Sequence, residues 1–101
     1  MGLKALYIIE VKTRLIEIDK ELDALVKLVN EASPESRAFW NPQVAELKER
    51  CKDLEGDHDL MRMFDESEWG GFADTMDKAL HKLRHDVGVA LGAIKAPLVP
   101  A

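Results

Sequence analysis

The fold of this chain is decided by residues 8–32, which read IIEVKTRLIEIDKELDALVKLVNEA. Apolar side chains recur in this stretch at spacings that alternate between three and four residues. They are Ile8, Val11, Leu15, Ile18, Leu22, Leu25, Val29 and Ala32. This spacing returns to one side of an α-helix on every turn and is typical of helices that pack against other helices. It predicts one long amphipathic helix over residues 3–32.

Two further helices are predicted from the rest of the chain. Asn41-Pro42 is typical of a helix start, because Asn is a good N-cap and Pro is tolerated in the first turn. A second helix is therefore expected over residues 42–65, broken near Gly56 because glycine disfavours a helix interior. A third is expected over residues 71–95. The apolar positions of these two helices are Val44, Leu47, Cys51, Leu54, His58 with Met61, and Ala73, Met76, Leu80, Leu83, Val87, Ala90 with Ile94.

Three helices of similar length with short connections favour an all-α, up-down-up bundle. The 101 residues fit one domain, expected over residues 1–96 with an extended tail at 97–101. No apolar stretch approaches the roughly 20 residues that span a bilayer. Lys4 is followed by only five apolar residues before Glu10, which is too few for a secretory signal. We therefore expect a cytoplasmic protein that contacts no membrane.

Five of the six aromatic residues fall between residues 39 and 72. In an up-down-up bundle, Phe39 and Trp40 would close one end and face the last turns of the third helix. The others, Phe64, Trp69 and Phe72, would close the opposite end and face the start of the first helix. The alternative is that one tryptophan anchors a partner, since Trp is enriched in binding hot spots.

Negative charge is concentrated in residues 53–77, which carry a net charge of −8, whereas residues 1–52 are neutral and residues 78–101 carry +3. Such a block attracts a partner protein with a basic surface and repels nucleic acid. The candidate partner-binding residues are Asp57, Asp59, Asp65, Glu66, Glu68, Trp69, Asp74 and Asp77. The alternative is that these are solvated caps and turns, partly neutralised by Lys4, Lys12 and Arg14.

Metal chemistry has only weak candidates. The acidic run from Asp53 resembles a calcium loop in spacing, but His58 stands where the turn needs glycine, and Phe64 stands where a glutamate must bind. The set Asp77, His81 and His85 shares one helical face, yet three basic residues surround it. His58 occupies an apolar position and is expected in the core. We predict no cofactor.

Catalysis is not expected either. The three serines fall near predicted helix starts, where capping explains them, and Cys51 lies among the buried positions. No glycine-rich phosphate loop is present in the sequence. The sequence therefore predicts a non-enzymatic protein.

The function predicted is binding to another protein, such as inhibition by occluding a basic nucleic-acid-binding surface. One alternative is a homo-oligomeric structural module. Gly88 and Gly92 would let a helix approach closely, from within the bundle or from a second copy. Leu6 and Ile9 also widen the apolar stripe of the first helix. A weaker alternative is a metal- or ligand-binding bundle centred on His58 or on the histidine pair.

Overall fold

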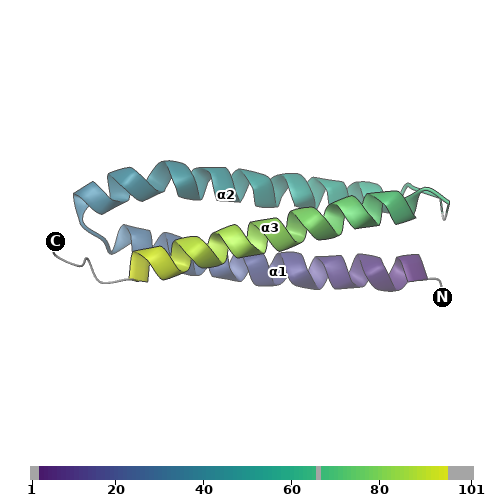
Figure 1. The fold of residues 1–101 in the computed structure, drawn as a ribbon, viewed down its shortest axis with the longest axis horizontal. Helices are drawn as coiled ribbons and strands as arrows, with labels where there is room; N and C mark the ends of the chain where they lie inside the picture. The colour runs from purple at the N-terminus through teal and green to yellow at the C-terminus, as the bar shows by residue number, and fades with distance from the viewer. Residues whose placement is uncertain (1–2, 66, 96–101) are drawn as a thin grey trace.

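The computed structural model describes residues 3–65 and 67–95. They form three α-helices, α1 (Leu3–Asn30), α2 (Pro34–Met61) and α3 (Trp69–Lys95). Each helix contacts the other two along a rod of 55 × 19 × 18 Å (Figure 1). The predicted all-α, up-down-up bundle is confirmed, and the described residues form no strand. The predicted tail at 97–101 lies outside the described residues.

The core lies along the central axis where the three helices meet. The apolar positions predicted for α2 are all buried, and so are those of α3 up to Ala90. On α1 the buried residues run from Val11 to Val29, while Ile8 at the helix start is half-buried. Burial of apolar surface at these regularly spaced positions is what holds the helices together. None of the helices in the described chain is both apolar enough and long enough to cross a membrane.

The start of α2 differs from the prediction. The helix begins at Pro34, where the Ser33 hydroxyl caps it by accepting a hydrogen bond from the Ser36 amide at 3.2 Å. It then runs through Pro42, so the predicted start at Asn41-Pro42 is wrong. Pro42 lies on the exposed side, where water can reach backbone oxygens that lose their helical partner. One turn earlier, the Phe39 carbonyl accepts a hydrogen bond from the Gln43 side chain at 3.3 Å.

The predicted break near Gly56 is also wrong, because α2 continues through it and ends at Met61 rather than residue 65. Glycine costs a helix interior only about 1 kcal/mol relative to alanine. The neighbouring Leu54 and His58 are buried against the rest of the bundle. Burying one apolar side chain contributes about 1.5–3 kcal/mol, so tertiary packing outweighs the local preference. The third helix starts at Trp69, two residues before its predicted start.

Aromatic side chains gather at both ends of the rod. At one end, Trp69 packs on Tyr7 with ring centroids 5.6 Å apart, and Phe64 packs on Phe72 at 4.8 Å. This matches the predicted closure of that end against the start of α1. At the opposite end Trp40 is half-buried, but Phe39 is 63% exposed and does not close the bundle as predicted.

Candidate functional site

The acidic side chains surround one end of the rod. We define the acidic end as residues 3–14, 53–65 and 67–78, which comprise the start of α1, the end of α2, the connection to α3 and the start of α3. Figure 1 shows that the N-terminal end of α1 and the α2–α3 connection lie at the same end of the rod. The predicted acidic residues that are exposed there are Asp59, Asp65, Glu68 and Asp74, while Asp57 and Asp77 are half-buried. Glu66 lies outside the described residues.

Asp77 is held by contacts within the bundle. One of its carboxylate oxygens lies 3.0 Å from Arg14 Nη1 and also accepts a hydrogen bond from the Tyr7 hydroxyl. The Tyr7 hydroxyl in addition lies 2.8 Å from the Ala73 carbonyl oxygen. Burial, together with the hydrogen bond to Asp77, raises the pKa of Tyr7 well above its usual range, so this hydroxyl stays protonated. These contacts tie α1 to α3 and make Asp77 a structural residue.

The remaining acidic side chains make fewer contacts within the bundle than Asp77 does. Asp74 pairs with Lys78 at 3.2 Å, a contact between two exposed side chains on one helix. Asp59 lies 3.7 Å from His58 Nδ1, which attracts it only when the imidazole is protonated. Within residues 3–65 and 67–95, no basic side chain lies within ion-pair distance of Asp57, Asp65 or Glu68. The charges of the exposed Asp65 and Glu68 therefore face solvent, while Asp57 is half-buried.

Trp69 is partly available for contact. Its ring packs against Tyr7, and its amide donates a hydrogen bond to the Asp65 carbonyl at 3.1 Å. The side chain remains half-buried at the first position of α3. The ring is thus fixed in position, while part of its surface reaches solvent.

Exposed apolar side chains accompany the acidic residues at this end. They are Leu3, Leu6, Ile9, Leu60 and Met63, with exposed fractions from 49% to 80%. Sequence reasoning singled out Leu6 and Ile9 but missed the other three. The sequence does contain a signal for them. These three residues do not fall at the alternating three- and four-residue spacing of the core positions, which indicates that they lie away from the core.

None of the three histidines belongs to a group of convergent metal-ligand atoms in the described residues. His58 is 4% exposed, and its Nε2 lies 3.0 Å from the Ile8 carbonyl oxygen, to which it can donate. The structure thus places it in the core, as its position in the spacing predicts. His81 and His85 are exposed, and Asp77 is engaged by Arg14, so the predicted face offers no convergent ligands.

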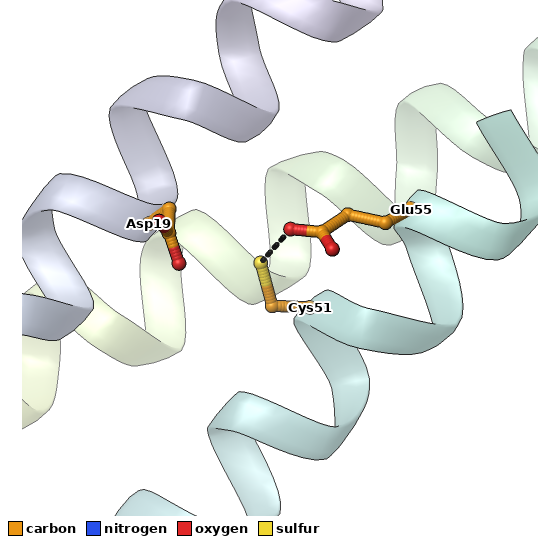
Figure 2. Close-up of side chains that lie close together, drawn as sticks. All are labelled: Asp19, Cys51 and Glu55. Carbon is orange, nitrogen blue, oxygen red and sulfur yellow. Dashed lines mark hydrogen bonds between the residues drawn. The ribbon is translucent and has the colours of Figure 1, made fainter.

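A different cluster brings metal-ligand atoms together, namely Asp19 of α1 with Cys51 and Glu55 of α2 (Figure 2). Within the described chain it is the only such group, and its three ligand atoms lie within 4.8 Å of one another. The Cys51 thiol donates a hydrogen bond to Glu55 at 3.8 Å. The cluster borders a cavity of about 410 Å³ that Asp23, Lys48 and Lys52 also line. The two lysine ammonium groups offset part of the carboxylate charge there.

The Cys51 thiol is not activated. Burial, with the nearby charges of Glu55 and Asp19, raises the pKa of this thiol to about 11. At neutral pH it is therefore protonated and is neither a nucleophile nor a ready metal ligand. A metal ion would have to displace the thiol proton before the sulfur could bind it.

We expect the Cys51 thiol to react with a disulfide reagent such as Ellman's reagent roughly ten times more slowly in the folded protein than in urea, or slower still. The thiolate is the reacting form, and the raised pKa makes it scarce. The folded-state rate should keep rising with pH toward 11, whereas in the unfolded chain it should level off near pH 9. Stopped-flow absorbance measures both rates, and Cys51→Ser is the blank. Equal rates in the two states would contradict the buried, protonated thiol.

A second groove runs between α2 and α3. Two cavities of about 520 and 280 Å³ lie along it and share Glu46, Arg50 and Asp86. Arg50 and Asp86 pair across the groove at 2.8 Å. The hydrogen bond from Arg50 lowers the pKa of Asp86, which therefore stays ionised and paired. The pair therefore joins α2 to α3 across the groove.

Gly88 and Gly92 face open space on α3. A Cβ atom added to either residue would meet nothing within 4 Å. The close helix approach considered within the bundle is therefore absent at these positions. An interface with a second copy stays a prediction.

The comparisons with known proteins give no relative. No protein-family model, no curated protein and no solved structure matches this chain. Its function must be inferred from its own residues.

Proposed function

We propose that this is a non-enzymatic protein that binds a basic surface of another protein through the acidic end. The observation that supports this most directly is a set of acidic side chains, Asp57, Asp65 and Glu68, with which no basic residue of the described chain forms an ion pair. A cytoplasmic partner whose basic surface otherwise holds nucleic acid would fit this charge. Occluding that surface would make the protein an inhibitor.

The physical reason is long-range electrostatic attraction. Residues 53–77 carry a net charge of −8, and their field extends about 8–10 Å into solution at moderate salt. Complementary charge steers encounter and raises association rates, often by tenfold or more at low salt. Asp77 contributes less to this field, because Arg14 lies against it. Asp57, Asp59, Asp65, Glu68 and Asp74 supply the charge available to a partner.

The test replaces Asp65 and Glu68 with lysine in one variant and measures binding to protamine, an arginine-rich protein, by surface plasmon resonance at several salt concentrations. We expect association at least roughly fivefold slower than for the unchanged protein, and a weaker dependence on salt. The matched control replaces Glu31 and Glu49 with lysine and therefore has the same net charge as the test variant. Both residues are exposed and lie outside the acidic end. Equal slowing in both variants would contradict a role for the acidic end.

A homo-oligomeric module is the second candidate, supported by the exposed face of α3. Gly88 and Gly92 lie open there, and Val89 between them is 57% exposed. Light scattering distinguishes the two candidates, because the partner-binding proposal expects a monomer of 11.4 kDa at low and high salt. A dimer that Gly88→Leu dissociates would favour the module.

A further inference from the structure

The acidic end also holds most of the exposed apolar surface. Of the eight large hydrophobic residues that are exposed in the described chain, five belong to it: Leu3, Leu6, Ile9, Leu60 and Met63. Met63 and Leu3 are the most exposed, at 80% and 75%. Apolar side chains that gather in one region of a surface mark a contact site more often than isolated ones do.

Apolar and acidic residues lie close together in sequence at the end of α2 and in the connection to α3. Leu60 follows Asp59 at the end of α2, and Met63 lies two residues before Asp65 in the connection to α3. Leu3 and Leu6 belong to the first turns of α1, at the same end of the rod (Figure 1). Between them, the Lys4 side chain donates a hydrogen bond to the Phe64 carbonyl, which joins α1 to the connection. The start of α1 and the connection that carries Met63 are thus held together.

We propose that the acidic end binds an amphipathic segment of a partner, with apolar side chains on one face and lysine or arginine at its margins. This inference rests on the proposed function and specifies the partner's chemistry. Complementary charge and apolar contact together determine which kind of segment can bind here. A segment that is only basic would leave Met63 and Leu3 in water, and one that is only apolar would desolvate Asp59 and Asp65 without pairing them.

The same argument disfavours two other occupants. A second copy would place one acidic end against another, and like charges that meet in an interface oppose association. A membrane with anionic lipids would repel the acidic side chains in the same way. A basic amphipathic helix satisfies both sets of residues, because it presents apolar and cationic side chains from adjacent faces.

The test uses synthetic peptides of about 14 residues, roughly four helical turns, with a fluorescent label. The first has leucine and lysine at amphipathic helical spacing, the second has the same composition in shuffled order, and the third is a lysine homopolymer. Fluorescence anisotropy with the full chain gives the affinities. We expect the amphipathic peptide to bind at least tenfold more tightly than either of the other two.

Variants of the protein assign this difference to the apolar residues. Replacing Leu3 and Met63 with serine should remove most of the tenfold advantage and leave binding of the lysine homopolymer unchanged. Both side chains are largely exposed, so the bundle should stay folded. Val89→Ser is the matched control, because Val89 is 57% exposed on α3 outside the acidic end, and it should leave the advantage intact.

The outcomes separate this inference from the proposed function. If the amphipathic and shuffled peptides bind equally and both weaken after charge reversal at Asp65 and Glu68, charge alone acts, and only the further inference is overturned. If no basic peptide binds, the proposed function is overturned as well. If the protein sediments with phosphatidylcholine vesicles, the inference is overturned in favour of a membrane. If its mass doubles as its concentration rises, and the variant with serine at Leu3 and Met63 stays monomeric, the inference is overturned in favour of a second copy.

Discussion

Replacing Leu83 with alanine is expected to lower the free energy of unfolding by about 3 kcal/mol. Leu83 is fully buried near the middle of α3, where side chains of all three helices meet in one core. Removing the Leu83 side chain beyond Cβ reduces the apolar surface that is buried on folding. It also leaves a cavity that the three packed helices cannot fully close. Small domains have only about 5–15 kcal/mol of stability, so this loss should be plain in the unfolding midpoint.

Urea unfolding followed by far-UV circular dichroism measures this change. The matched control is Val89→Ala on the same helix, where the side chain is 57% exposed. The control should change the free energy of unfolding by about 0.5 kcal/mol or less. Similar losses in the two variants would contradict the burial pattern that defines the bundle.

Replacing Gly56 and Gly88 together with alanine is expected to stabilise the protein by roughly 1–2 kcal/mol. Both lie inside helices, in α2 and α3, and a Cβ atom at either position would meet nothing within 4 Å. Alanine therefore fits without strain and loses less conformational entropy on folding than glycine does. For a domain of 101 residues this corresponds to a rise in Tm of roughly 5–10 °C.

Differential scanning calorimetry measures the rise in Tm. The reciprocal control is Ala24→Gly, an exposed position inside α1, which should cost about 1 kcal/mol. Loss of stability in the double alanine variant would show that one of the two positions is covered by something other than solvent. A loss that Gly88→Ala alone reproduces would then support a contact at Gly88 with a second copy.

The sequence predicts the core well, because burial and helical spacing are directly linked. Positions such as Leu22, Leu47 and Leu80 recur on one side of their helices and are buried. The ends of α2 were harder to predict, since Pro42 and Gly56 carry strong local preferences against a helix. Both lie on the exposed side of a helix whose opposite side is buried, and the gain from that burial decides the outcome.

The candidate site could be predicted only in part. The number of charges at the acidic end follows from the sequence, but their partners do not. Arg14 meets Asp77 across 63 residues, which depends on how α1 and α3 are placed along each other. The approach of Asp19 to Cys51 likewise requires the relative placement of α1 and α2. The place of Met63 in the connection, rather than in the helix, follows from the end of α2 at Met61, whereas the spacing predicts an end at residue 65.

The rod shape described above governs how the protein moves in solution. Its radius of gyration is 16.4 Å, compared with about 13 Å for a globular domain of 100 residues. The larger frictional drag means that a monomer should leave a size-exclusion column early, at the volume of a heavier globular protein. Its backbone N–H bonds lie close to the long axis, because helical amides point along their helix. Nuclear spin relaxation at those amides should therefore report mainly the slow end-over-end tumbling of the rod.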